Sequence, residues 1–188
     1  MRLNMKRMIV ALAVVVVIGG GSALASPSPS SDSSGYWSGR ASALLMEIQE
    51  ETASLRPHAD RLGSFARNPR ISWQSHATYL DRVKGHINSV GESIAELQRI
   101  RPDVLRWQQQ AIAEVTSHAA QVAASTQAAI VHLRENQNHL FVPEYTDHLM
   151  TIADRSEDMK QTVDKFLEYE KTMEKLQRLQ KDLELAGV

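Results

Sequence analysis

Apolar and small residues recur at alternating steps of three and four along the chain, beginning just after Gly35. This spacing places them on one face of a helix, and Ser38 is predicted to cap the start of that helix. The stripe consists of Trp37, Ala41, Leu44, Ile48, Thr52, Leu55, Ala59 and Leu62.

Pro57 lies inside this first helical pattern. A proline in a helix interior removes one backbone donor, so we expect a kink near Glu50–Ala53 or a break at Arg56. The pair Asn68-Pro69 is predicted to end the helix.

A second helix is predicted from Ser72 to Ile100, because apolar residues repeat there with heptad spacing. Gly85 and Gly91 weaken this helix by ~1 kcal/mol each relative to Ala. We expect these glycines to let another helix approach closely. The heptad positions are Trp73, His76, Leu80, Val83, Ile87, Val90, Ile94 and Leu97.

Two further helical patterns follow Pro102. The third is predicted to end at Phe141-Val142-Pro143, and the fourth to run from Pro143 to Ala186. The third stripe consists of Trp107, Ile112, Val115, Ala119, Val122, Thr126, Ala129, Leu133 and Leu140. The fourth consists of Tyr145, Leu149, Ile152, Met159, Val163, Phe166, Met173, Leu176, Leu179 and Leu183.

The four patterns are joined by short connections, and no segment alternates with the period of a strand. Short connections make consecutive helices antiparallel neighbours. The sequence therefore predicts an all-α protein whose residues 36–188 form one antiparallel up-down-up-down four-helix bundle with an extended C-terminal helix.

The fourth helix is predicted to be longer than its neighbours. Its 44 residues would span ~66 Å, whereas the 29 residues of the second would span ~44 Å. If it stays unbroken, its last ~15 residues extend past the bundle and leave an apolar stripe uncovered. We predict that this stripe binds an unknown protein partner or a second copy of the chain; the alternative is a bend near Glu168–Glu170 that folds the tail back. The predicted partner-binding residues are Met173, Leu176, Leu179 and Leu183.

The first 25 residues have the pattern of a secretory signal peptide. Arg2, Lys6 and Arg7 precede an apolar run, and Ala23-Leu24-Ala25 supplies small residues for cleavage after Ala25. An uncleaved anchor is the alternative, although the run is short for a bilayer. Residues 26–35, SPSPSSDSSG, are predicted to be a flexible leader. We expect a periplasmic or secreted protein with no membrane span after cleavage.

Charge and cysteine content exclude several classes of function. The signal segment holds three basic and no acidic residues, which leaves 18 basic and 22 acidic residues and a net charge of −4. Nucleic-acid-binding domains usually carry a basic face, so none is expected as a partner. The absence of cysteine excludes disulfides, thiolate metal sites and thiol catalysis.

Three pairs of the form Glu-x-x-x-His suggest metal chemistry: Glu114/His118, Glu135/His139 and Glu144/His148. Residues four apart share a helix face, but the Glu-x-x-His spacing of di-iron bundles is absent. His139 and His148 flank the turn at Pro143, so together with Glu144 they are the weak candidates for a metal site. The competing interpretation is an ordinary solvated helix pair.

His76 differs from the other histidines because it lies on a heptad seam. It is a weak candidate for a metal or haem ligand. The more common role of such a histidine is that of a core residue bonded to a polar group of a neighbouring helix.

No catalytic motif accompanies these residues. The chain lacks a Gly-x-Ser-x-Gly elbow and a glycine-rich phosphate loop, and helical packing without a cofactor predicts no obvious cleft. We predict a non-enzymatic protein-interaction or structural module of the cell envelope that needs no cofactor. The alternative is a metal- or cofactor-binding periplasmic bundle.

The segments Ser72–Ile112 and Ala128–Leu140 resemble an uncharacterised family of short exported all-helical bacterial proteins. The similarity rests on Trp73, His76, His86, Asn88, Gly91, Trp107, Gln108 and Gln109. It implies export and a helical fold, and it implies no activity.

Overall fold

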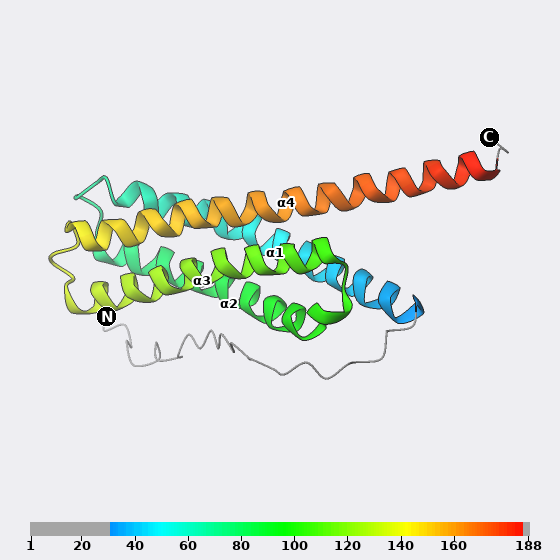
Figure 1. The fold of residues 1–188 in the computed structure, drawn as a ribbon. Coiled ribbons are helices and arrows are strands. Elements are labelled where there is room, and N and C mark those ends of the chain that lie inside the picture. Colours follow the sequence, from blue (N-terminus) through cyan, green and yellow to red (C-terminus); the bar gives the residue numbers. More distant parts are fainter. Residues whose placement is uncertain (1–30, 186–188) are drawn as a thin grey trace.

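The computed structural model describes residues 31–185, and within them the chain is helical without strands. Its elements are α1 (Ser31–Phe65), α2 (Trp73–Ile100), the short 3-10 helix η2 (Arg101–Asp103), α3 (Arg106–Glu135) and α4 (Pro143–Leu185), shown in Figure 1. The all-α prediction is confirmed. The signal segment, residues 26–30 of the expected leader, and Ala186 lie outside the described residues.

Helix α1 begins earlier than predicted. It starts at Ser31, so residues 31–35, which were expected in the leader, are part of the helix. No proline occurs in this stretch after Pro29, and serine and aspartate are tolerated in a first turn. Ser38 consequently lies inside the helix and does not cap it; its hydroxyl donates to Gln108 Oε1 at 3.0 Å.

Helix α1 also continues through Pro57, so the predicted break at Arg56 is wrong. Pro57 is exposed, whereas Leu55 and Ala59 on either side are fully buried. Packing of the buried face holds the helix together across the missing backbone donor.

Helix α2 follows its heptad pattern closely. The predicted start is confirmed, because the Ser72 side chain accepts a bond from the backbone N–H of Ser75 at 3.4 Å. The expected role of Gly85 and Gly91 is wrong, since a Cβ at either position would meet nothing within 4 Å. A close helix contact occurs instead at Gly63, where a Cβ would lie 3.0 Å from Ala153 Cβ on α4.

Helix α3 ends at Glu135, before the predicted end at Phe141–Pro143. Asn136 terminates it: its backbone N–H and its side-chain Nδ2 both donate to the carbonyl of His132, at 2.8 and 3.2 Å. Leu140 therefore lies in the connection to α4 and not on the helix.

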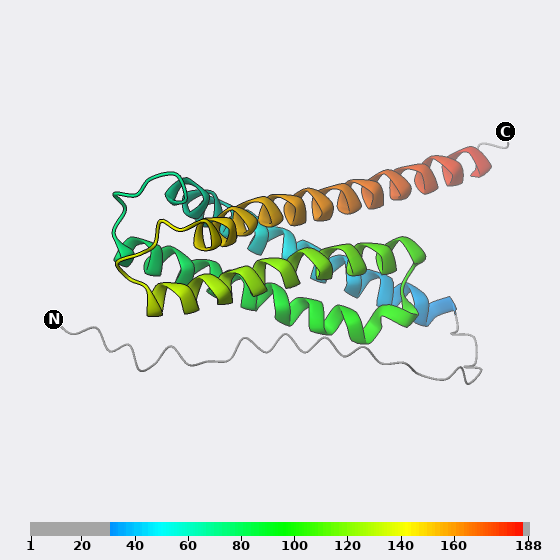
Figure 2. The ribbon, with the colours of Figure 1, turned by 60° about the vertical axis from the view of Figure 1, so that its left-hand side comes forward.

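The buried stripes of the four long helices meet in one core. Helix α1 packs against α2 and α4, and α3 packs against the same two helices (Figures 1 and 2). Of the predicted stripe positions up to residue 163, nearly all are buried, while Trp37, Trp73 and Trp107 pack at the edge of the core.

Helix α4 is unbroken and extends past the helices that pack against it. Its contacts end where Trp107 meets Phe166 and Tyr169, with ring centroids 6.4 and 5.6 Å apart, and where Ser42 bonds Glu170. Every residue from 171 to 185 is exposed, and Figures 1 and 2 show this part projecting beyond the other helices. The alternative of a bend near Glu168–Glu170 is wrong. We call residues 171–185 the projecting segment.

No helix within residues 31–185 is both long enough and apolar enough to cross a bilayer.

Candidate functional sites

His76 forms a buried polar pair with Tyr145 of α4. The two side chains are 4% and 0% exposed, and His76 Nδ1 lies 2.9 Å from the Tyr145 hydroxyl. Phe65 packs against the His76 ring at 5.0 Å between centroids, and His132 stacks on Tyr145 at 4.9 Å. The structure thus places His76 in the core, where it bonds across the interior to Tyr145 of α4, a helix that does not pack directly against α2.

Burial fixes the protonation of this pair. It lowers the pKa of His76 to about 4, so the imidazole is neutral at pH 7. It raises the pKa of the Tyr145 phenol, which therefore keeps its hydrogen.

The hydrogen-bond direction follows from the partners of the phenol. Within the described residues the Tyr145 hydroxyl has His76 Nδ1 as its sole hydrogen-bond partner. A buried hydroxyl that donated to nothing would lose a hydrogen bond, so Tyr145 donates to Nδ1. The His76 hydrogen is then on Nε2.

A cleft of about 420 Å³ opens beside this pair. It lies at the end of the molecule where residues 66–72 join α1 to α2 and residues 136–142 join α3 to α4 (Figure 1). His76 lines it together with aromatic residues from three segments, Phe65, Trp73 and Phe141. The expectation that the helices leave no obvious cleft is therefore wrong.

The metal candidates are not gathered into one site. Glu135 ends α3 and His139 lies in the following connection, so this pair does not share a helix face as predicted. His139 is exposed, and its carbonyl accepts a bond from His132 Nε2 at 3.3 Å. Glu144 and His148 lie in the first turns of α4, at an exposed and a half-buried position. Across residues 31–185, no three histidine or acidic side chains are grouped so that they could hold a metal ion.

A second cluster that contains histidines, formed by Glu51, His58 and His86, was not predicted from the sequence. His86 Nδ1 on α2 lies 2.9 Å from Glu51 Oε2 on α1, and the His58 ring stacks on His86 at 5.6 Å. Burial, followed by the charges of Arg82 and His86, lowers the pKa of His58. Glu51 and His58 are seven residues apart on α1, which is the signal that they share a face.

Gln108 is a structural residue that sequence reasoning missed. It is fully buried, and its side-chain oxygen accepts from Ser38 Oγ and from the backbone N–H of Leu105. Its nitrogen donates to the Ser38 carbonyl at 2.9 Å and to Ser42 Oγ at 3.1 Å. These bonds tie α1 to the start of α3.

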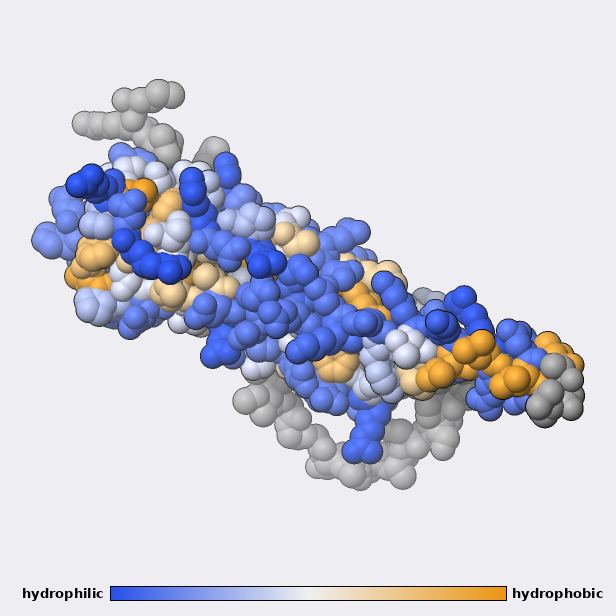
Figure 3. Space-filling model, turned by 90° about the horizontal axis from the view of Figure 1, so that it is seen from above, coloured by the Kyte–Doolittle hydropathy of each residue, from blue (hydrophilic) through white to orange (hydrophobic). Residues whose placement is uncertain are grey.

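The projecting segment carries the predicted partner-binding stripe. The exposed fractions are 37% for Met173, 55% for Leu176, 51% for Leu179 and 56% for Leu183. Figure 3 shows apolar surface collected at this end of the molecule. Arg178 Nη2 lies 3.3 Å from Glu174 Oε2, an ion pair of residues four apart on the helix.

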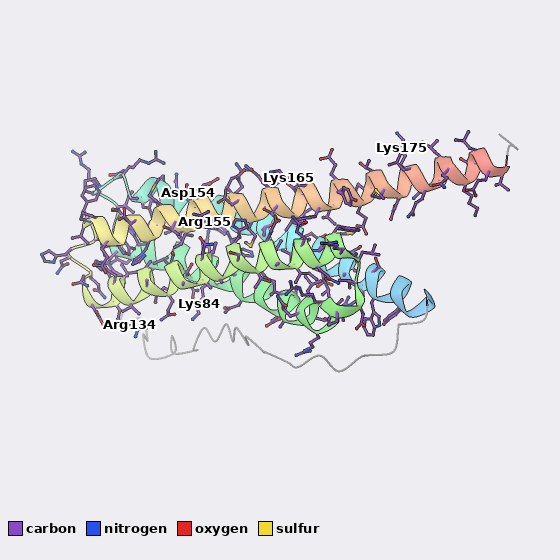
Figure 4. The ribbon with its side chains drawn as sticks, in the orientation of Figure 1. Lys84, Arg134, Asp154, Arg155, Lys165 and Lys175 are labelled. Atoms are coloured by element: carbon purple, nitrogen blue, oxygen red, sulfur yellow. The ribbon has the colours of Figure 1, made fainter. Side chains whose placement is uncertain are left out.

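The remaining positions of the projecting segment are charged or polar, apart from Leu185. Lys175 lies on it, whereas Lys165 lies on the packed part of the same helix (Figure 4). The segment is therefore an amphipathic helix whose apolar stripe is exposed.

The chain matches no protein-family model, no curated protein sequence and no solved structure in the comparisons made.

Proposed function

We propose that this protein is an exported up-down-up-down four-helix bundle that acts, without catalysis, as a protein-interaction or structural module in the cell envelope. The projecting segment is its binding surface, through Met173, Leu176, Leu179 and Leu183. The partner is a protein surface with an apolar groove, on a second copy or on a different chain.

The topology part of the proposal is supported by the connections between helices. Residues 66–72, 101–105 and 136–142 are short links, and short links favour antiparallel neighbours. The packing of α1 against α2 and α4, and of α3 against the same two helices, fits a cyclic arrangement of four.

The binding part is carried by one observation: an unbroken helix continues beyond its own core with its apolar stripe exposed. A helix of about 15 residues is marginal in water when nothing packs on it. Contiguous exposed apolar surface also marks interaction sites more often than ordinary surface does. Docking of this stripe into a groove would stabilise the helix and would also remove its apolar surface from water.

The location part rests on the sequence of residues 1–25, whose basic start, short apolar run and Ala-Leu-Ala site are typical of cleaved export signals. The net negative charge of the remaining chain fits a protein partner better than an anionic lipid surface.

The test compares three forms of the mature chain: full length, a chain ending at Glu170, and full length with Leu176→Gln and Leu179→Gln. Mass in solution is measured by light scattering, and partner capture by mild crosslinking in envelope fractions. We expect both altered forms to stay helical and to lose the larger mass or the captured partner. A larger mass in the purified full-length protein identifies a second copy; a partner captured only from envelope fractions identifies a different chain.

A matched control changes the charged face of the same segment, with Lys175→Gln and Arg178→Gln. It should associate as the unchanged protein does. Loss of helicity on truncation would place the segment in the core and contradict the proposal, as would association that survives removal of the stripe.

A further inference from the structure

The cleft beside His76 lies at the opposite end of the molecule from the projecting segment (Figure 1). Its residues are therefore separate from those of the proposed protein-binding surface. Its volume of about 420 Å³ falls within the ~300–1,000 Å³ common for small-molecule sites.

One ring nitrogen of His76, Nε2, remains available to form a hydrogen bond with a ligand in this cleft. The Nδ1 edge is occupied by Tyr145, and Nε2 has no hydrogen-bond partner among residues 31–185. His76 Nε2 is not among the fully buried side-chain atoms that lack a partner, such as His118 Nδ1 and Thr126 Oγ1. Nε2 is therefore not completely enclosed by the protein. His76 lines the cleft, and Nε2 is the ring nitrogen that Tyr145 leaves available for a ligand there.

The direction of the Tyr145 bond makes this nitrogen a donor. Tyr145 donates to Nδ1, so the hydrogen of the neutral imidazole is on Nε2. A matching ligand atom is therefore an acceptor, such as a carbonyl oxygen.

The walls of the cleft set the character of the rest of the ligand. Phe65, Trp73 and Phe141 contribute aromatic surface, and Asn68 and Gln137 contribute amides. His76 and His139 are the titratable side chains that line the cleft as the described residues form it, and no lysine, arginine, aspartate or glutamate lines it. A carboxylate or ammonium ligand would lose hydration here without meeting an oppositely charged lysine, arginine or carboxylate, which is costly.

We propose that this cleft binds an uncharged small molecule in which a carbonyl or similar acceptor is carried on an aromatic or apolar body. The acceptor receives the hydrogen of His76 Nε2, and the body packs against Trp73 and Phe65. Tyr145 is a positioning residue that holds the His76 ring in this orientation.

The experiment uses four small probes of similar size on the mature full-length chain at pH 7.5. Acetophenone has the acceptor, ethylbenzene lacks it, and benzoate and benzylammonium carry opposite charges. Binding is followed by NMR, through the Trp73 indole and the backbone amides of residues 66–72 and 136–142. We expect acetophenone to bind about tenfold more tightly than ethylbenzene, as one satisfied hydrogen bond allows, and both charged probes to bind more weakly than acetophenone.

The double variant His76→Phe, Tyr145→Phe removes the donor while keeping both rings and leaves no unpaired phenol. In it the affinities for acetophenone and ethylbenzene should become nearly equal. Trp73→Ala should weaken both probes alike, because it removes packing surface and keeps the donor. His86→Phe, outside the cleft, should leave the affinity for acetophenone unchanged.

Several outcomes measured on the unaltered protein overturn the proposal without depending on the folding of any variant. These are the absence of acetophenone binding, equal binding of acetophenone and ethylbenzene to the unaltered protein, and tighter binding of benzoate or benzylammonium than of acetophenone. Shifts confined to residues away from the cleft would overturn it as well.

Discussion

His76 is neutral inside the protein, with a pKa of about 4 against 6.5 for a histidine in water. The unfolded chain therefore takes up a proton as the pH falls below 6.5, and the folded chain does not do so until about pH 4. The free energy of unfolding is unaffected by this group above 6.5 and decreases between 6.5 and 4, by about 3 kcal/mol in all. The lowered pKa of His58 acts in the same direction.

This pH effect is measured by urea unfolding at pH 7.5 and pH 4.5, for the unaltered protein and for the double variant His76→Phe, Tyr145→Phe. The carboxylates titrate in both, so the smaller loss of stability expected in the variant isolates the contribution of His76. His139→Gln, at an exposed position, is the control and should lose as much stability as the unaltered protein. An undiminished loss in the double variant would contradict the burial argument.

At the scale of elements, α1 tolerates Pro57 because its buried face holds the helix on both sides. Pro57→Ala restores the backbone donor toward the carbonyl of Ala53 and changes only an exposed side chain. We expect the free energy of unfolding to rise by about 1–3 kcal/mol, as measured by chemical denaturation. Ser54→Ala, at an exposed neighbouring position, is the control and should change it by at most about 0.5 kcal/mol. A loss of stability in Pro57→Ala would mean that the path of α1 depends on the proline.

The elements also show what a hydrophobic pattern can predict. The buried faces of α1 to α4 follow from the period of 3.6, because burial selects apolar residues at that spacing. The end of α3 does not follow, since Leu140 continued the pattern by chance while Asn136 ended the helix through its bonds to His132. The start of α1 was missed for a similar reason, because residues 31–35 carry no apolar stripe.

At the scale of the whole molecule, the two ends differ in how far sequence could predict them. The projecting segment follows from helix length, which depends on one stretch of chain. The cleft requires the connection between Phe65 and Trp73 to meet the connection that holds Phe141, and these two connections lie far apart in the sequence. The pairing of His76 with Tyr145 likewise depends on how α2 and α4 lie across the core from each other, and periodicity within one helix does not contain that information.

The contrast within α4 gives a final expectation for the molecule as a whole. Residues 145–167 contribute Tyr145, Leu149 and Val163 to the core. The backbone amide hydrogens of this range should therefore exchange with solvent only through larger unfolding events. The projecting segment has no such packing, and in a dilute monomer its amides should exchange far faster. Hydrogen exchange followed by mass spectrometry measures both parts in one experiment. If a second copy covers the stripe, protection of residues 171–185 should rise with protein concentration while that of 145–167 stays constant, and Leu176→Gln with Leu179→Gln should abolish the rise. Equal protection of the two parts in a dilute monomer would show that the segment is held by its own chain.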